Sequence, residues 1–330
     1  MASSRLPVLY VTRELPSLAQ KRLQALTNVE VRQHNSVQAI GRSALLQAAR
    51  EADGIVCLLS DKIDKEFLQA AGSQLRVIST VSVGYDHVDM AALKAHGGIR
   101  LGYTPDVLTD ATADTTVLLA LMASRRAKEA LNIVSTGSGS QFSLSRGLGV
   151  QFSGKTLGIV GLGRIGVATA ARLRAFGIST VLYSGSRPHE ERARTVDAQH
   201  VSFEHLLEQS DLVCICCPLN DRTTGMFDRE AFGRMKQSAI LVNTARGAIV
   251  NQDDLLDALD NERIAHAALD VTVPEPIPKD HPLVVHPRCT ILPHIGSATE
   301  ETRNAMANLA IDNALAGIFG KPLKAEVSLN

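Results

Sequence analysis

Short apolar runs alternate with longer amphipathic stretches over about the first hundred residues of the chain. An apolar run of four or five residues predicts a buried strand, and a stretch of about ten residues between two runs predicts a helix. This alternation is typical of a parallel sheet covered by helices on both faces. We expect strands at Val8–Thr12, Val29–Arg32, Ile55–Leu59, Val77–Thr80 and Ile99–Gly102, and helices at Ser17–Leu26, Ser43–Glu51, Asp64–Ala71 and Asp89–His96.

The same alternation returns in the second half of the chain. A helix rich in Ala, Leu and Thr is predicted from Thr109 to Arg126, and we expect it to cross from a first domain into a second. A last helix, about Glu300–Ala316, is expected to cross back. Further strands are predicted at Thr156–Val160, Thr180–Tyr183, Leu212–Cys216, Ile240–Asn243, Ala267–Val271 and Thr290–Leu292.

A glycine-rich loop, Gly161-Leu162-Gly163-Arg164-Ile165-Gly166, lies between a predicted strand and a predicted helix at Val167–Phe176. In this context Gly161 permits a tight turn, Gly163 lets a pyrophosphate approach the backbone, and Gly166 lets helix and strand pack closely. The helix N-terminus offers unpaired N–H groups to the phosphates. The alternative is an ordinary glycine-rich turn, which would not need a strand before it and a helix after it. Because about half the chain precedes the loop, that half is expected to have another role.

Length and charge limit the classes of protein. A chain of 330 residues is long enough for two domains, each with its own core. A formal net charge of zero and scattered Lys and Arg residues argue against nucleic acid or an anionic membrane as a partner. No apolar run approaches the roughly 20 residues that span a bilayer, and the apolar part of the N-terminus is too short for a secretory signal. We therefore expect a cytoplasmic protein.

The five cysteines predict neither disulfides nor a metal site. Cys214, Cys216 and Cys217 fall in and beside a predicted core strand, and no pair of Cys-x-x-Cys motifs is present. Since structural zinc sites need such spacing, these cysteines are better explained as small buried side chains.

Three ionisable residues follow predicted strands near the C-terminal end of the chain: Arg246, Glu275 and His294. The carboxyl ends of strands form the ligand crevice of an open α/β sheet. Each residue alone has an ordinary alternative: a surface ion pair for Arg246, a solvated turn residue for Glu275, and a structural histidine for His294. Together with the glycine loop they predict a proton-transfer site with a cation that binds an anionic substrate.

These motifs resemble the D-2-hydroxyacid dehydrogenase family, and within it the glyoxylate/hydroxypyruvate reductases. The resemblance extends over nearly the whole chain. It is carried by the glycine loop and by the segments Leu58–Asp61, Ser82–His87, Thr104–Asp110, Thr244–Gly247, Asn251–Leu255, Leu269–Val271 and Leu292–Ser297.

The resemblance implies an α/β fold of two Rossmann-like, doubly wound parallel-sheet domains. Residues 1–108 and 299–330 would form a flavodoxin-like substrate domain. Residues 109–298 would form an NAD(P)-binding domain inserted into it.

The resemblance also implies an activity and its residues. The expected reaction is reduction of a small 2-oxo acid, glyoxylate to glycolate or hydroxypyruvate to D-glycerate, by hydride transfer to C2. His294 would protonate the developing alkoxide, Glu275 would favour the charged ring, and Arg246 would offer a planar fork to the substrate. The implied substrate-binding residues are Ser60, Val83, Gly84, Arg246, His294 and Ser297, with the carboxylate on backbone N–H groups near Val83 and Gly84.

Most of the implied cofactor-binding residues belong to the glycine loop, namely Gly161, Leu162, Gly163, Arg164, Ile165 and Gly166. The others are Ser184, Ser186, Arg187, Cys217, Pro218, Thr244, Ala245, Asp270, His294 and Gly296. Asp270 matches the family position near the nicotinamide amide. Its alternative is an exposed carboxylate at the end of a strand.

The chain departs from an NAD-preferring pattern after the second strand of the cofactor domain. An acidic residue is expected there to bind the ribose 2′-OH, but none occurs before Glu190. Ser184, Ser186 and Arg187 suit a 2′-phosphate instead, so we expect NADPH, with NADH possible. The alternative is that Arg187 is only a solvated loop residue.

A second departure lies in the Gly/Ser-rich segment Ser135–Gly149. The similar animal-type reductases have tryptophans there, whereas this chain has no Trp and only Phe142 as an aromatic residue in the segment. The family generally forms dimers through the cofactor domain. We therefore expect a homodimer in which the segment packs against the partner through Phe142 and Leu144, the alternative being a surface loop without such a role.

Other functions remain open within this resemblance. The C-terminal binding protein corepressors share the fold and the catalytic residues but bind peptides, and phosphoglycerate and D-lactate dehydrogenases are related enzymes. We expect a reductase, because the chain ends about where the fold should end and has no long tail or regulatory domain.

Overall fold

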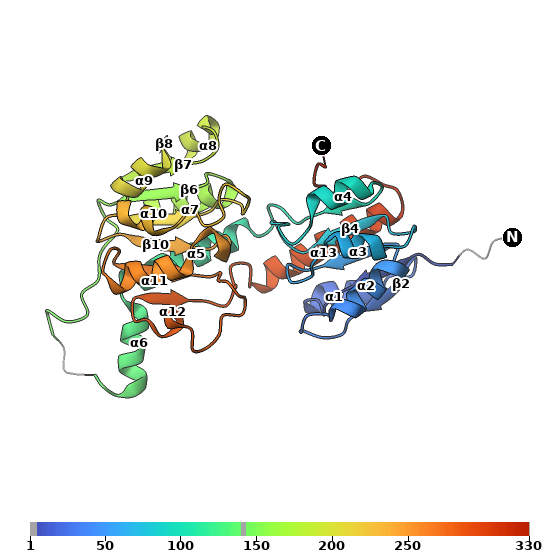
Figure 1. Cartoon of the computed structure of the whole chain (residues 1–330), viewed down its shortest axis with the longest axis horizontal. Coiled ribbons are helices and arrows are strands. Elements are labelled where there is room, and N and C mark those ends of the chain that lie inside the picture. The colour runs from blue at the N-terminus through green and yellow to red at the C-terminus, as the bar shows by residue number, and fades with distance from the viewer. Residues whose placement is uncertain (1–4, 140–142, 330) are drawn as a thin grey trace. The chain divides into compact units, whose positions relative to one another are not determined.

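The computed structural model describes residues 5–139 and 143–329, and these form two compact α/β units. The first unit comprises Met1–Leu108 and Ala298–Asn330, and the second comprises Thr109–Ser297. Each unit has its own parallel sheet with helices on both faces (Figure 1). The predicted fold class is confirmed.

The sheet of the first unit has five parallel strands in the order β2-β1-β3-β4-β5, which is the flavodoxin-like order. All four pairs of neighbouring strands are parallel, as short apolar strands separated by helices predict. The strands are β1 (Val8–Val11), β2 (Glu30–Gln33), β3 (Gly54–Cys57), β4 (Val77–Thr80) and β5 (Arg100–Gly102).

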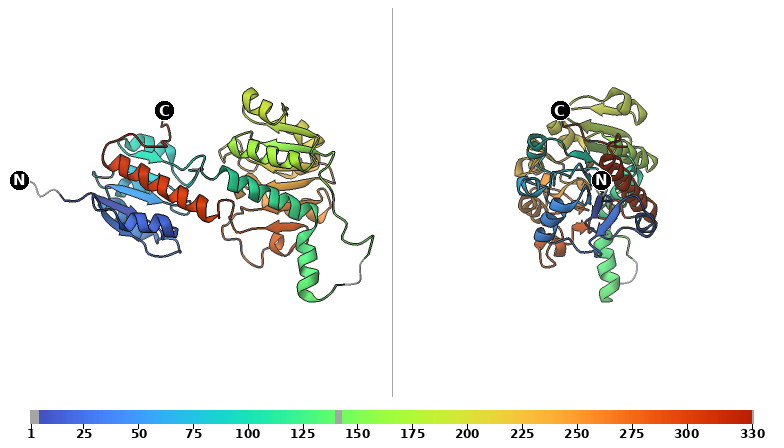
Figure 2. Two further views of the ribbon diagram at one scale, coloured as in Figure 1. Left: turned by 180° about the vertical axis from the view of Figure 1, so that it is seen from behind. Right: turned by 90° about the vertical axis from the view of Figure 1, so that its right-hand side faces the viewer.

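Two apolar layers cover the faces of this sheet. Helices α2 (Arg42–Glu51), α3 (Lys65–Ala70) and α4 (Met90–His96) pack on one face, and α1 (Ser17–Gln24) and α13 (Glu300–Ile318) pack on the other. The C-terminal helix α13 therefore belongs to the first unit, as Figure 2 shows.

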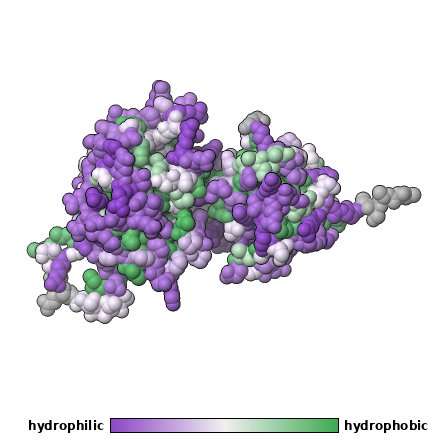
Figure 3. Space-filling model, in the orientation of Figure 1, coloured by the Kyte–Doolittle hydropathy of each residue, from purple (hydrophilic) through white to green (hydrophobic). Residues whose placement is uncertain are grey.

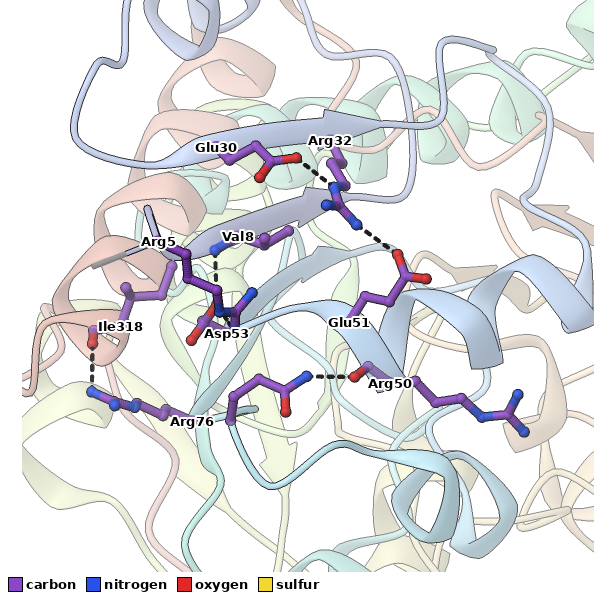
Figure 4. A network of polar contacts seen from close by, with 10 residues as sticks. Arg5, Val8, Glu30, Arg32, Arg50, Glu51, Asp53, Arg76 and Ile318 are labelled. Atoms are coloured by element: carbon purple, nitrogen blue, oxygen red, sulfur yellow. Dashed lines mark hydrogen bonds and ion pairs between the residues drawn. The ribbon is translucent and has the colours of Figure 1, made fainter. Parts of the chain in front are cut away.

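The amino ends of β1 and β3 carry a polar network (Figure 4). The buried Asp53 carboxylate accepts hydrogen bonds from the Val8 N–H at 2.8 Å and from Arg5 at 3.2 Å. Arg76 donates to the carbonyl of Ile318 at the end of α13. A pocket of about 400 Å³ adjoins this network. These contacts lie at the sheet edge opposite the carboxyl ends, and the Arg76 contact ties α13 to the sheet.

The second unit has seven parallel strands in the order β12-β11-β10-β9-β6-β7-β8. The chain order reverses between β6 and β9, which creates the switch point where α/β sheets bind ligands. The strands are β6 (Thr156–Val160), β7 (Thr180–Ser184), β8 (Ala198–His200), β9 (Leu212–Ile215), β10 (Ile240–Asn243), β11 (His266–Leu269) and β12 (Cys289–Ile291).

Helices cover both faces of this second sheet. Helices α5 (Thr109–Ser124), α7 (Arg164–Ala175) and α8 (Glu190–Thr195) contribute to one apolar cluster. Those that contribute to the opposite cluster are α9 (Phe203–Gln209), α10 (Arg229–Arg234), α11 (Gln252–Asp260) and α12 (Pro282–Val285).

Two elements of this unit were not predicted from the sequence. One is the short strand β8, and the other is α6 (Ala127–Thr136), which follows α5 after Arg126 adopts a left-handed backbone conformation with φ of 51°. No residue of α6 is buried, and the helix projects from its unit in Figures 1 and 2. Across the described part of the chain, no helix combines the length and apolar character needed to cross a membrane.

Candidate active site

The glycine loop has the backbone geometry that a dinucleotide site needs. Gly161 has a φ of 97°, and a Cβ there would lie 2.7 Å from the Cys217 backbone. Gly166 faces the Gly161 carbonyl, where a Cβ would approach to 2.4 Å. By contrast, no atom lies within 4 Å of a Cβ built on Gly163, so this position is open to a ligand. The three glycines thus fit the three expected roles.

Helix α7 begins directly at this loop. Gly163 is its N-cap and Arg164 its first residue, so the helix starts earlier than the predicted Val167. The helix is anchored through Ala170 and Leu173, which are fully buried. Leu162 is buried, Ile165 is half-buried and Arg164 is exposed. The N-terminus of α7 therefore presents N–H groups at the carboxyl end of β6, as phosphate binding requires.

The residues after β7 divide into a buried and an exposed set. Ser184 ends the strand, is buried, and accepts the Gly161 N–H through its carbonyl at 2.8 Å. Ser186 and Arg187 lie in the following turn and are exposed. The first acidic residue after the strand, Glu190, is the first residue of α8. Only Ser186 and Arg187 therefore present exposed side chains that suit a 2′-phosphate.

The turn after β10 positions Arg246. Asn243 is fully buried, and its side-chain amide makes two hydrogen bonds. It accepts the Ala245 N–H at 3.0 Å and donates to the Arg246 carbonyl at 2.9 Å. The Thr244 hydroxyl lies 2.7 Å from that of Thr116 on α5. A Cβ on Gly247 would lie 2.3 Å from the Thr272 carbonyl. This turn is therefore pressed against the segment that carries Glu275.

Glu275 and His294 form the central pair of the site. His294 Nδ1 lies 2.7 Å from Glu275 Oε2, and Glu275 Oε1 accepts the Thr272 N–H at 3.0 Å. Burial alone would raise the pKa of Glu275. However, the hydrogen bond and charge of His294, the Thr272 N–H and the charge of Arg246 together hold that pKa below its ordinary value. Glu275 is therefore a carboxylate near neutral pH.

His294 is held by its backbone as well as by the side-chain contact with Glu275. Its backbone N–H donates to the Asp270 carbonyl at 2.8 Å, and its φ is 54°. Because an ionised carboxylate only accepts hydrogen bonds, Nδ1 carries a proton and Nε2 is the nitrogen that can exchange one. The ring is about one-third exposed, so it is accessible to a ligand.

Asp270 is a buried carboxylate beneath the same loop. It accepts the N–H groups of Ile295 and Gly296 at 2.8 and 2.7 Å and is 1% exposed. Burial raises its pKa, although these two N–H groups and the charge of His294 act in the opposite direction. The exposed strand-end alternative for Asp270 does not fit this burial.

The predicted substrate-binding residues of the first unit also follow strands. Val83 and Gly84 are half-buried after β4, where the Ser82 hydroxyl donates to the Gly84 carbonyl at 2.7 Å. Ser60 is exposed after β3 and accepts a hydrogen bond from Arg13 at 2.7 Å. In the second unit, Ser297 is half-buried directly after Gly296.

The structure brings together Arg246, Glu275, His294 and Asp270 within the second unit, and it adds residues that we did not predict. Asn243 holds the Arg246 turn, and Gln252 pairs with the backbone of Val273. Gln252 stands in a segment that carries the family resemblance and Asn243 directly precedes one, but the Gln252 contact depends on how the start of α11 meets the Val273 loop.

Cys216 and Cys217 directly follow β9, and burial opposes ionisation of both thiols. Burial raises the pKa of Cys217 to about 11 and that of Cys216 to about 12. Within residues 5–139 and 143–329, no group of three His, Cys, Asp or Glu side chains is arranged to hold a metal ion.

Two residues, Phe142 and Leu144, were predicted to contact a partner subunit. Phe142 lies outside the described residues, and Leu144 is 84% exposed.

The second unit combines a seven-stranded parallel sheet, this glycine loop and a His–Glu pair beyond the carboxyl ends of the strands. These features are typical of a dinucleotide-binding α/β protein. Residues 117–296 match the family described as D-isomer specific 2-hydroxyacid dehydrogenase, NAD binding domain. The chain belongs to this family of oxidoreductases, which confirms the resemblance found in the sequence.

Relatives match along nearly their whole length. The chain is 45% identical over 329 residues to a glyoxylate reductase/hydroxypyruvate reductase of Homo sapiens, with 100% of both chains covered. A solved structure of a Thermus thermophilus protein shares 40% identity and a TM-score of 0.89, covering 97% of this chain and 100% of that one. An NADPH-dependent glyoxylate/hydroxypyruvate reductase of Sinorhizobium meliloti, solved with NADP and malonate, shares 28% identity and a TM-score of 0.83, covering 98% and 97%.

Proposed function

We propose that this protein reduces glyoxylate and hydroxypyruvate with a reduced nicotinamide cofactor. The observation that carries the proposal is the Glu275–His294 pair at 2.7 Å, located in a chain that is 45% identical over its full length to a reductase of these two acids. The pair supplies a positioned proton donor, which carbonyl reduction requires.

The residues of the glycine loop fit a dinucleotide. Gly163 leaves open space at the N-terminus of α7, where a pyrophosphate would accept backbone N–H groups. Cys217, Pro218, Thr244, Ala245, Asp270 and Gly296 follow strands of the same sheet and would line the rest of the cofactor site. The bound cofactor would supply the hydride for C2 of the substrate.

His294, Glu275 and Arg246 perform the remaining chemistry in this proposal. The His294 imidazolium donates the proton from Nε2 to the substrate oxygen as negative charge develops there. Glu275 fixes the ring through Nδ1 and compensates its charge. Arg246 offers a planar, permanently charged fork that matches the carboxylate and carbonyl oxygens of a 2-oxo acid.

The substrate carboxylate is assigned to the first unit. The backbone N–H groups at Val83 and Gly84 would bind it, and the Ser82 hydroxyl, bonded to the Gly84 carbonyl, keeps that turn in shape. Ser60 and Ser297 are proposed as further polar contacts. A corepressor-like role would need no turnover, so a kinetic assay separates the two functions.

NADPH is the proposed cofactor. Ser186 and Arg187 are exposed after β7, and no acidic residue precedes Glu190, so a 2′-phosphate would meet a cation and a hydroxyl instead of a carboxylate. The Sinorhizobium meliloti relative, solved with NADP, supports this assignment. NADH remains usable in the proposal, since the glycine loop serves both cofactors.

A homodimer through the second unit is part of the proposal. The exposed helix α6 carries Leu131, Ile133 and Val134 at 62%, 45% and 81% exposure, and apolar residues are visible at the surface around α6 in Figure 3. A second copy of the chain that covers these apolar side chains explains them better than permanent exposure to water does. We also propose a cytoplasmic location, because all five cysteines are free thiols, as in reducing compartments.

The test is a steady-state assay with the purified protein. Glyoxylate, hydroxypyruvate and pyruvate are each supplied with NADPH or NADH, and oxidation of the cofactor is followed by absorbance. We expect turnover of the first two acids with NADPH, and weaker turnover of pyruvate. Cofactor binding without turnover of either acid would contradict the proposal and favour a binding protein.

A further inference from the structure

The segment that carries Glu275 is held by the side chain of Gln252. Gln252 Nε2 donates to the Val273 carbonyl at 2.6 Å, and Gln252 Oε1 accepts the Val273 N–H at 2.7 Å. Val273 itself is 50% exposed, so burial of its side chain does little to fix this part of the loop. One side-chain amide therefore binds both polar groups of one backbone residue.

We call the two hydrogen bonds between Gln252 and Val273 the clamp. Its helical side, α11, is held in position by the core. Gln252 is the first residue of α11, whose N-cap Asn251 accepts the N–H groups of Asp253 and Asp254. Leu255 and Leu259 of the same helix are fully buried in the core. A capped and anchored helix start moves little, so the position of Gln252 is set by the core.

The other end of the clamp leads to the catalytic pair. Next to Val273, the Thr272 N–H donates to Glu275 Oε1, and the Thr272 hydroxyl donates to the Pro274 carbonyl at 2.9 Å. The second oxygen of Glu275 then meets His294 Nδ1. The backbone that Gln252 holds is thus the same backbone that orients the Glu275 carboxylate.

We propose that Gln252 is a positioning residue that fixes the Glu275 carboxylate against His294 through the backbone of Val273. Its kinetic consequences rest on the function proposed above. Only a neutral side-chain amide of this length donates and accepts at once. An ionised glutamate keeps the acceptor but loses the donor, and alanine loses both.

The kinetic test compares Gln252→Ala and Gln252→Glu with Asp253→Asn, a control on the next, exposed residue of the same helix. Loss of the clamp should lower kcat about tenfold, because the Glu275 carboxylate would be held in place against His294 for a smaller part of the time. The basic limb of the pH profile should also move to lower pH, whereas KM for NADPH and the Tm should change little. An unchanged kcat and pH profile in Gln252→Ala would overturn the proposal.

A double-mutant cycle then shows whether Gln252 acts through Glu275. In a Glu275→Gln background, Gln252→Ala should cost less than about twofold, because the carboxylate it positions is gone. The same loss of kcat in both backgrounds would mean that Gln252 acts in another way, and the proposal would fail.

Hydrogen exchange tests the clamp without any substrate. In Gln252→Ala, the Val273 and Thr272 N–H groups should exchange at least about tenfold faster than in the wild type, with the core of α11 unchanged. Gln252→Glu should keep part of the Val273 protection, because it retains the acceptor. Unaltered exchange at both residues would refute the clamp, whereas a wild type that reduces neither acid would refute only the proposed function.

Discussion

Glu275 Oε2 lies 2.7 Å from His294 Nδ1, and this contact joins two loops that leave neighbouring strands of one sheet. Strand β11 precedes the Glu275 loop and β12 precedes the His294 loop, and the two strands are paired in parallel. Both residues therefore emerge at the same sheet edge. The pair gives the protein an oriented imidazole with a carboxylate counter-charge beside it.

Replacing His294 with alanine should remove the proton donor. We expect the rate of reduction to fall by roughly 10²–10⁴, the range for a positioned general acid, with little change in the Kd for NADPH. Stopped-flow and steady-state rates with glyoxylate, together with fluorescence titration of NADPH, measure the two quantities. His205→Ala, on an exposed position of α9, is the matched control. Near-normal turnover of His294→Ala would remove this residue from the mechanism.

Replacing Glu275 with glutamine should change the pH dependence of reduction. The pKa of Glu275 is held below its ordinary value, so the wild-type carboxylate stays charged through the neutral range and favours the imidazolium form of His294. Without this charge the imidazolium has no counter-charge beside it, so the protonated ring is less favoured. Since reduction needs the protonated ring, the basic limb of the kcat profile should move to lower pH.

Profiles of kcat from about pH 5 to 10 for wild type and Glu275→Gln check this direction. Glutamine can still accept the hydrogen bond from Nδ1, so the comparison isolates the charge. A basic limb at the same pH in both proteins would show that Glu275 has another role.

The sequence contained enough to predict the fold class and the ionisable residues that the structure brings together around Glu275. Strand periodicity located the parallel strands, and glycine spacing indicated the loop where Gly161 needs a positive φ and Gly166 needs close packing. Arg246, Glu275 and His294 could be found because each follows an apolar strand. The position of a strand end in the sequence is enough to place such a residue at the sheet edge.

Other features depend on tertiary contacts that periodicity does not encode. The polar edge strand β8 has no buried residue in its three positions, so it lacks the apolar signal of a core strand. Helix α6 buries nothing within the chain, and its start is set by a left-handed residue, Arg126. The Gln252–Val273 clamp joins the first residue of α11 to a loop, and no local pattern distinguishes this glutamine from a surface one.

Cofactor preference should depend on Arg187. In the wild type, kcat/KM for NADPH should exceed that for NADH, because an exposed guanidinium and a serine stand where an acidic residue would bind the ribose. Arg187→Ala should lower kcat/KM for NADPH about tenfold or more, the value of one charge-assisted hydrogen bond, and leave the NADH value nearly unchanged.

Arg194→Ala is the control for this experiment, because it removes an equal charge from an exposed position of α8 that is paired with Glu190. A loss with Arg187→Ala alone would identify a specific phosphate contact. If the wild type uses both cofactors equally well, or if both variants lose the same amount, Arg187 does not set the preference.

Assembly should depend on the exposed face of α6. Leu131 and Val134 are three positions apart on this helix, at 62% and 81% exposure, and so lie on one side of it. If a second copy covers this side, the wild type should be a dimer by light scattering, and Leu131→Asp/Val134→Asp should be a monomer because two charges would be buried. Asn132→Asp adds a charge to the same helix on a different side and should remain a dimer. A monomeric wild type would refute the dimer, and a double variant that still dimerises would place the interface away from α6.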